Sequence, residues 1–216
     1  KERISAQSTL VLVPSLSLLS QTLREWTFAA KEPFDVLCVC SDKTVVKRSD
    51  QDELIESVKD VSFPVTSYIE EIREFLNNNG PKVIFSTYQS SSLIVEAQSD
   101  EKTASFDLSI VDEAHRCTGD RDGMFATILD DSLIKSKRRL FLTATPRTYG
   151  PNLLKSAEER GVEISGMDDE AVFGEVFHSL PFGKAIKQEL LSDYQVVIVG
   201  VNKPMIYEWI QNKELL

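Results

Sequence analysis

Two adjacent acids and a nearby histidine are the residues of this sequence that are best placed to do chemistry. Asp112, Glu113 and His115 follow residues 108–111, a short apolar run typical of a buried strand. In open α/β sheets, ligands bind at the carboxyl ends of such strands. An acid there can hold Mg²⁺ through water, and the metal bridges the β- and γ-phosphates of a nucleotide. The acid beside it can orient and deprotonate the attacking water as a general base.

The two acids also have a plainer interpretation, in which they only stabilise the positive N-terminus of a helix by occupying its first turn. A second polar strand end weighs against it. Thr143 and Thr145 follow the apolar run 140–142, and in an extended segment both hydroxyls lie on one side. They could hydrogen-bond His115 and relay the state of a bound phosphate, although a strand-ending turn capped by threonines is the alternative for these two residues.

The elements that must position these residues follow an alternating pattern over about the first 145 residues. Strand-like runs that are apolar on both faces alternate with helical patterns, which predicts an open, doubly wound α/β sheet of buried parallel strands. A helical repeat runs from Leu16 to Trp26, and Ser67 with Glu70 forms a capping box for a helix through about Leu76. The predicted strands are residues 9–13, 36–40, 83–86, 108–111 and 140–142.

The pattern changes at about residue 147. Residues 152–160 read as a helix ended by Gly161, residues 167–170 as an acidic turn, residues 185–191 as a short helix and residues 195–201 as a strand. This tail is expected to lead towards a further domain rather than to close the fold.

Composition and charge limit the classes of protein. The chain has 216 residues, of which 42% are hydrophobic and 27% charged, as in ordinary globular domains. It has no apolar run near the roughly 18 residues of a membrane span and no signal-peptide pattern. These features predict a cytoplasmic protein with no membrane partner. The net charge of −10 argues against tight, autonomous binding of nucleic acid, although a groove can still be locally basic.

The cysteines do not indicate a disulfide framework. Cys38, Cys40 and Cys117 form an odd and sparse set, which is typical of a reducing compartment. Cys38 and Cys40 lie two apart on a predicted strand, and we interpret them as buried core residues rather than as metal ligands.

Four segments together resemble the motifs of superfamily-two helicases. Residues 112–115, Asp-Glu-Ala-His, and residues 143–145, Thr-Ala-Thr, match motifs II and III. Residues 9–15 with Ser20 and Gln21 look like motif Ia, and residues 83–90 are similar to motif Ib. Each motif is modest alone, but the four lie in the family's order and span about two thirds of the chain.

This resemblance implies a RecA-like fold of the P-loop NTPase type, in which helices sandwich a parallel sheet. It also implies ATP and Mg²⁺ as cofactors, with Asp112 holding the metal through water and Glu113 acting as the hydrolytic base. His115, Thr143 and Thr145 would couple hydrolysis to movement. The residues expected to contact the DNA backbone are Pro14, Ser15, Gln21, Thr87, Tyr88 and Gln89.

The tail narrows the resemblance to a predicted-helicase group that includes the motors of single-polypeptide Type I restriction enzymes. The segments that carry it are residues 165–170, 173–174, 182–186 and 191–194. The resemblance implies a DNA helicase or translocase of a restriction-modification or related defence system, with duplex DNA favoured over single strands. It further implies that residues 1–150 form the first RecA-like motor domain, truncated at its N-terminus, and that residues 151–216 extend towards a second RecA-like domain.

The sequence departs from the family at the phosphate cradle, which needs Gly-x-x-x-x-Gly-Lys followed by Ser or Thr. The nearest match, Gly161 to Gly166, is followed by Met167 and Asp168, so it lacks both the lysine and the hydroxyl. In the family the cradle precedes motif Ia, where only eight residues stand here. We therefore expect the isolated fragment to hydrolyse ATP negligibly and the activity to belong to a full-length protein.

Two other classes of function are compatible with the sequence. A non-catalytic DNA-binding or interaction module would retain the fold without the chemistry. A metal hydrolase would use Asp112, Glu113 and His115 as ligands, although they are few for a firm metal site.

Several large side chains have both a structural and a functional interpretation. We expect Trp26 to pack in the core rather than to stack on a base. Tyr88 suits packing and base stacking equally. Residues 137–139, Lys-Arg-Arg, are interpreted as a solvated edge rather than as a phosphate contact.

Overall fold

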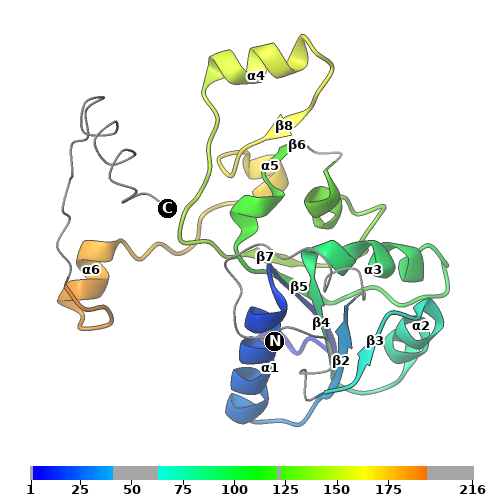
Figure 1. Ribbon diagram of the computed structural model, residues 1–216. Helices are drawn as coiled ribbons and strands as arrows, with labels where there is room; N and C mark the ends of the chain where they lie inside the picture. The colour runs from blue at the N-terminus through cyan, green and yellow to red at the C-terminus, as the bar shows by residue number, and fades with distance from the viewer. Residues whose placement is uncertain (1, 41–62, 121–122, 194–216) are drawn as a thin grey trace, which may run out of the picture. The chain divides into compact units, whose positions relative to one another are not determined.

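The computed structural model describes residues 2–40, 63–120 and 123–193 (Figure 1). The chain divides into two compact units, Lys1–Glu175 and Val176–Leu216, and every described strand belongs to the first. The division at residue 150 between a motor domain and an extension stays a prediction. None of the described helices is both long and apolar enough to cross a lipid bilayer.

The first unit is built around a six-stranded sheet, which confirms the predicted α/β class. The strands lie in the order β3-β2-β4-β1-β5-β7, and every pair of neighbours is parallel (Figure 1). All five predicted strands are present, and a sixth, β3, was not predicted. The strands are β1 Ser8–Val13, β2 Asp35–Val39, β3 Val65–Thr66, β4 Lys82–Thr87, β5 Leu108–Val111 and β7 Arg139–Phe141.

Helices cover both faces of this sheet. The α-helices of the first unit are α1 Leu16–Ala29, α2 Ile69–Asn77, α3 Ser91–Gln98, α4 Pro151–Glu158 and α5 Glu170–Phe173. Successive side chains of a strand point to opposite faces, so β1 contributes to two cores. Leu10 packs in one cluster with Ile72 of α2 and Ile94 of α3, whereas Val11 packs in the other with Leu19 of α1. The predicted sandwich of helices around a parallel sheet is confirmed.

Helix α1 begins where the sequence predicts. Ser15 caps it, because its Oγ accepts a hydrogen bond from the backbone N–H of Leu18 at 3.3 Å. Leu19, on the inner face of the helix, is fully buried. Trp26 packs edge-on against Phe85 with ring centroids 5.8 Å apart. The interpretation of Trp26 as a core residue is therefore confirmed.

The predicted capping box at Ser67 is wrong. Helix α2 begins at Ile69 with Tyr68 as its N-cap, and no side chain caps it. The backbone N–H of Tyr68 donates instead to Oγ1 of Thr66 at 3.0 Å. This local turn competes with the cap that the sequence suggests and moves the start of the helix by one residue.

Charged side chains that bind backbone groups hold the amino end of the sheet. Lys82, the first residue of β4, is buried, and its ammonium donates to the carbonyl of Leu76 in α2 at 3.2 Å. Asp107, which precedes β5, accepts from the backbone N–H of Ser8 at 3.1 Å and from the ammonium of Lys137 at 2.7 Å. The hydrogen bond from Lys137 holds the pKa of Asp107 below its ordinary value.

The three cysteines lie in the cores. Cys38 and Cys40 belong to the cluster under α1, and Cys117 belongs to the cluster on the opposite face. Burial raises the pKa of each thiol to about 12, so the thiols stay neutral and unreactive. The interpretation of Cys38 and Cys40 as core residues is confirmed.

Strand β7 differs from the prediction in two ways. It begins at Arg139, one residue before the predicted run, and its residues are half-buried rather than buried. Among the described strands it pairs only with β5, because it lies at the end of the sheet. Leu142, just beyond it, is 41% exposed. A segment with the composition of a buried strand therefore forms an edge of the described sheet.

The chain after β7 forms small elements. Helix α4 confirms the helix predicted near residues 152–160, and the predicted acidic turn precedes α5. A second, two-stranded sheet pairs β6 Gly119–Asp120 with β8 Ile164–Ser165 in antiparallel fashion. In the second unit, α6 Phe182–Lys187 begins and ends earlier than the predicted helix 185–191. The strand predicted at residues 195–201 lies outside the described residues.

Candidate functional site

The carboxyl ends of β5 and β7 bring the two polar strand ends of the sequence together. The strands are parallel neighbours, with Val111 paired to Phe141 in the ladder. The residues that follow them therefore leave the sheet at the same end (Figure 1). The backbone N–H of Ala114 donates to the carbonyl of Leu142 at 2.8 Å, so the turn after β5 is fixed to the turn after β7.

Asp112 and Glu113 form a sharp turn instead of the first turn of an α-helix. Glu113 has φ +51° and ψ +45°, a left-handed conformation that residues other than glycine rarely adopt. The chain then enters a short 3-10 helix, Ala114–Cys117, which the side chain of Glu113 does not cap. The plainer interpretation of the acids as helix-stabilising residues therefore does not fit, whereas backbone strain of this kind clusters at functional sites.

The carboxylate of Asp112 has a fixed orientation at the end of β5. It is half-buried, and its Oδ1 accepts a hydrogen bond from the backbone N–H of Glu113 at 3.0 Å. A carboxylate keeps further acceptor positions on both oxygens after one such bond. Oxygen ligands from one or two carboxylates are what a hydrated Mg²⁺ ion takes from a protein, so the residue present fits that ion.

Three side-chain oxygens surround one nitrogen of His115. Its Nδ1 lies 3.0 Å from Oγ1 of Thr143, 3.3 Å from Oγ1 of Thr145 and 3.2 Å from Oε2 of Glu113. The backbone N–H of Thr145 also donates to Oγ1 of Thr143 at 3.1 Å. A ring nitrogen that carries a proton can donate it to one partner at a time, so the carboxylate and the hydroxyls compete for Nδ1.

Tyr88 belongs to the core beneath Asp112. Its side chain is 1% exposed, and its ring packs edge-on against Phe125 with centroids 5.5 Å apart. Its hydroxyl donates to the main-chain carbonyl of Asp112. Burial keeps the pKa of the phenol far above its ordinary value, so the group stays a donor. In this structure the ring is not accessible for stacking on a base, which favours the packing alternative for Tyr88.

The other residues expected to contact DNA divide into exposed and buried ones. Gln21 and Gln89 are exposed. Pro14 and Thr87 are buried, and Ser15 uses its hydroxyl to cap α1. The side chains of the two glutamines are therefore accessible at the surface, whereas two of the other three residues are buried and the third caps a helix.

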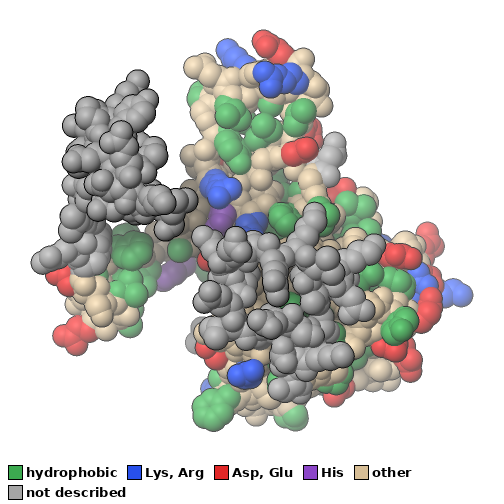
Figure 2. Space-filling view, in the orientation of Figure 1, with side chains coloured by type: hydrophobic (Ala, Val, Ile, Leu, Met, Phe, Trp, Pro, Cys, Tyr) green, Lys and Arg blue, Asp and Glu red, His purple; other side chains and the backbone are tan. Residues whose placement is uncertain are grey.

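The basic side chains that are visible on one face of the described surface are dispersed. Figure 2 shows the Lys and Arg side chains of one face lying among acidic and apolar ones rather than in one broad patch. This distribution agrees with the net charge of −10.

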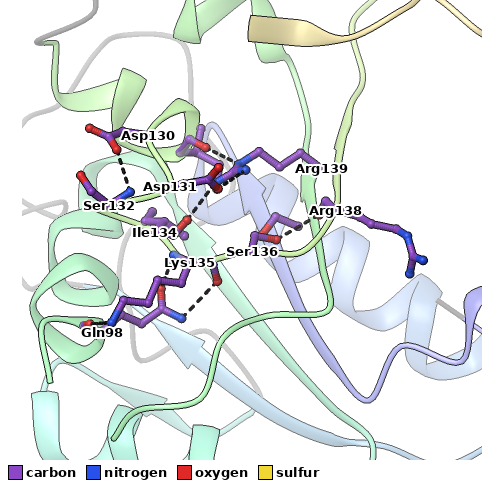
Figure 3. A network of polar contacts seen from close by, with 11 residues as sticks. Gln98, Asp130, Asp131, Ser132, Ile134, Lys135, Ser136, Arg138 and Arg139 are labelled. Atoms are coloured by element: carbon purple, nitrogen blue, oxygen red, sulfur yellow. Dashed lines mark hydrogen bonds and ion pairs between the residues drawn. The ribbon is translucent and has the colours of Figure 1, made fainter. Parts of the chain in front are cut away.

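Arg139 holds the loop that leads into β7, a role that the sequence did not reveal. Its guanidinium pairs with the carboxylate of Asp131 at 2.7 Å and donates to the carbonyls of Ile128 at 2.6 Å and Ile134 at 2.8 Å. Figure 3 shows this side chain pointing into the loop, while Arg138 points away from it. The prediction of a solvated edge is wrong for Arg139, whose side chain is only 15% exposed. Its backbone partners carry no signal in the sequence.

Gly161 and Gly166, whose spacing comes nearest to a phosphate-cradle pattern, lie at the ends of a helix and of a strand. Gly161 follows α4 with φ +71°, and Gly166 is buried directly after β8.

The alternative of a metal hydrolase finds no ligand set among the described residues, because no three of their His, Cys, Asp or Glu side chains are grouped to hold a metal ion.

Comparison with protein families and curated proteins gives consistent matches. Residues 1–148 match the family model described as Type III restriction enzyme, res subunit. Probable helicases of African swine fever virus, from isolates of Kenya and Malawi, are 30% and 31% identical over 207 residues, which cover 95% of this chain. The matches cover 20% of each viral protein, so the chain spans about a fifth of the length of the curated relatives it matches.

Two solved structures resemble this chain in fold and in sequence. A nuclease-deletion mutant of the Type ISP restriction-modification enzyme LlaGI, in complex with a DNA substrate mimic, matches 87% of the chain with a TM-score of 0.63 and 32% identity. The ATP-dependent Type ISP restriction-modification enzyme LlaBIII, bound to DNA, matches 90% with a TM-score of 0.67 and 32% identity. The likeness covers 14% and 13% of those two chains.

Proposed function

Because the chain belongs to the family of the Type III restriction enzyme res subunit, we propose that it is the ATP-hydrolysing lobe of a motor that moves on DNA. Its fold is that of the first RecA-like domain of a superfamily-two helicase. The observation that carries the proposal is the meeting of the acids after β5 with the threonines after β7 around His115. This meeting lies at the sheet end where such folds bind ligands.

We propose distinct roles for the residues of this cluster. Asp112 holds Mg²⁺ through water, and the ion, when bound, neutralises charge that develops on the β- and γ-phosphates of ATP. Glu113 orients the attacking water and accepts its proton. His115 contacts Glu113, Thr143 and Thr145, so a change in the hydrogen bonding of the acid alters the turn after β7. That contact supports a role in coupling hydrolysis to movement.

We propose DNA as the partner, with duplex favoured over single strands. The support is that LlaGI and LlaBIII are described in complex with a DNA substrate mimic and with DNA. Exposed Gln21 and Gln89 would contact the backbone, and Pro14, Ser15, Thr87 and Tyr88 would hold the segments that present them. Restriction-modification or a related defence system is the setting that these relatives suggest.

The proposed motor requires more than these residues. The sequence contains no Gly-x-x-x-x-Gly-Lys pattern followed by Ser or Thr. We therefore propose that residues 1–216 alone hydrolyse ATP negligibly. In this view residues 1–150 form the first motor domain, and residues 151–216 extend towards a second RecA-like domain of a longer protein.

A single substitution in that longer protein tests the proposed function. Glu113→Gln removes the general base while keeping the size of the side chain. DNA-stimulated ATP hydrolysis should fall about 10²- to 10⁴-fold, the range in which a positioned base contributes. ATP turnover is measured with and without duplex DNA, and nucleotide binding is measured separately and should persist.

The matched control is Glu71→Gln, which makes the same change at an exposed position of helix α2 and should leave the rate unchanged. An ATPase rate that survives Glu113→Gln would exclude this site as the hydrolytic centre. Absence of DNA-stimulated ATP hydrolysis in the unsubstituted longer protein would favour the alternative of a non-catalytic DNA-binding module.

A further inference from the structure

The chain that follows β7 is also linked by hydrogen bonds to His115, through Tyr149 and Thr118. The hydroxyl of Tyr149 donates to Oγ1 of Thr118 at 3.1 Å, and Oγ1 of Thr118 donates to the main-chain carbonyl of His115 at 2.7 Å. Each hydroxyl in this chain of hydrogen bonds has a consistent role, because Thr118 can accept one bond while donating another. The backbone of His115 is thus linked to a residue that follows the threonines.

The approach of Tyr149 is fixed by the segment around β8. Gly119 pairs with Ser165 in the small antiparallel sheet, so the residue after Thr118 is tied to β8. The backbone N–H of Met167 donates to the carbonyl of Arg147 at 2.8 Å. A Cβ at Gly166 would lie 2.3 Å from Oδ1 of Asp168 and 3.3 Å from the Cα of Thr148, so a larger residue here would displace its neighbours. Residues 165–167, which the sequence singled out without a role, therefore contact the chain beside both Thr118 and Tyr149.

These contacts close a ring around His115. The imidazole is held by the hydroxyls of Thr143 and Thr145, and the main chain is held by Thr118. Tyr149 joins the two, because it follows Thr145 in the chain and bonds Thr118. Since three oxygens within 3.3 Å compete for one ring nitrogen, a small displacement of the His115 backbone changes which of them it bonds.

We propose that Thr118 and Tyr149 are positioning residues, which hold His115 so that its Nδ1 lies between the carboxylate of Glu113 and the hydroxyls after β7. They act through His115 and touch neither nucleotide nor metal. The structural part stands on the hydrogen bonds alone, and only its consequence for ATP hydrolysis rests on the proposed function.

Imidazole nitrogen NMR tests the structural part without ATP. The chain has two histidines, so ¹⁵N-histidine labelling gives two ring systems, and His178→Gln assigns them. In Tyr149→Phe, which removes only the hydroxyl, the Nδ1 and Nε2 shifts of His115 should move in the direction caused by Thr143→Val, by a smaller amount. Those of exposed His178 should stay unchanged. Tyr68→Phe, at an exposed tyrosine, should move neither.

A second pair of variants covers the case in which Tyr149→Phe does not fold. Thr118→Ser keeps the hydroxyl, so the His115 shifts should stay as in wild type. Thr118→Val keeps the shape of the side chain but removes the hydroxyl, so the His115 shifts should move. If the His115 shifts are the same in wild type, Tyr149→Phe and Thr118→Val, the positioning role is overturned.

The consequence for the motor is measured in the longer protein. Tyr149→Phe should lower kcat of DNA-stimulated ATP hydrolysis about 3- to 10-fold with KM for ATP unchanged, because displacing a group near the chemistry costs rate more than binding. A smaller amount of folded protein would weaken the His115 signals of the folded form without moving them. An unchanged kcat, in a protein whose hydrolysis Glu113→Gln abolishes, would overturn the consequence for hydrolysis and leave the proposed function standing, so the two proposals fail separately.

Discussion

The two ends of the same sheet treat their polar side chains in opposite ways. At the amino end, Lys82, Asp107 and Arg139 each bind backbone groups, and two of them also bind an oppositely charged side chain. At the carboxyl end, one nitrogen of His115 faces three oxygens, and Glu113 adopts a left-handed backbone. Polar side chains at the amino end are therefore bonded within the fold, whereas those at the carboxyl end include the ones proposed to carry the chemistry.

This contrast predicts which property each substitution changes. A group whose hydrogen bonds are all made inside the fold contributes to the free energy of unfolding when it is kept, and its loss leaves buried partners unsatisfied. A group that keeps hydrogen-bonding positions open for a ligand contributes little to the free energy of unfolding. Substitutions at the carboxyl end should therefore change activity, and those at the amino end should change stability.

The largest effect is expected for Asp112→Asn in the longer protein. Loss of the charge that would hold Mg²⁺ should lower ATP turnover by about 100-fold or more, as for removal of one electrostatic contact in other active sites. The midpoint of urea unfolding should hardly change. Turnover measured over a range of Mg²⁺ concentrations, together with unfolding by urea, checks both. A variant that is mainly unstable would break the contrast between the two ends.

Arg139→Met should have the largest effect on folding. It removes the donor to the carbonyls of Ile128 and Ile134 and the partner of Asp131, which should cost about 2–3 kcal/mol in the free energy of unfolding. Arg138→Met is the matched control, because the neighbouring side chain is exposed and should change stability by about 0.5 kcal/mol or less. Equal urea midpoints for the two variants would refute the anchoring role of Arg139.

Tyr88→Phe tests a residue near the carboxyl end of the sheet whose side chain, like those at the amino end, is bonded to a backbone group within the fold. Loss of the bond to the carbonyl of Asp112 should cost about 1–2 kcal/mol of stability. Affinity for duplex DNA should not fall, because the ring is buried. Tyr68→Phe serves as the exposed comparison for urea unfolding and DNA titration. Weaker DNA binding at unchanged stability would restore the base-stacking alternative.

The smallest effect concerns pH and Asp107. Its pKa is lowered in the folded chain, so its contribution to stability is complete above the unfolded value of about 4 and is lost as pH falls through the folded value. Asp107→Asn should be less stable than wild type by about 1 kcal/mol at neutral pH, and the difference should shrink below pH of about 4. Urea unfolding of both chains at several pH values measures it. A stability difference between the two chains that grows as the pH falls would contradict a lowered pKa of Asp107.

The strand order explains what could be predicted from sequence. The apolar runs of β1, β2, β4 and β5 are buried on both faces, and each was predicted with nearly correct bounds. β3 escaped prediction because its two residues, Val65 and Thr66, show no periodicity. The half-buried state of β7 depends on its place at the end of the sheet, which composition does not encode.

The candidate site shows the same division. The sequence predicted that the hydroxyls of Thr143 and Thr145 could hydrogen-bond His115, and the contacts of His115 have that geometry. The roles of Arg139 and Thr118 could not be predicted, because both bind main-chain carbonyls that any residue would supply. Tyr149 and Thr118 are 31 positions apart in sequence, and only the fold brings their hydroxyls together.

Position 113 is one where folding and chemistry favour different amino acids. Glycine and asparagine adopt a backbone with φ +51° more readily than glutamate does. A non-glycine residue held in such a conformation costs the fold on the order of 1–3 kcal/mol. The most stable form of this domain is therefore not its working form, and selection for stability alone would be expected to remove the carboxylate that the proposed reaction needs.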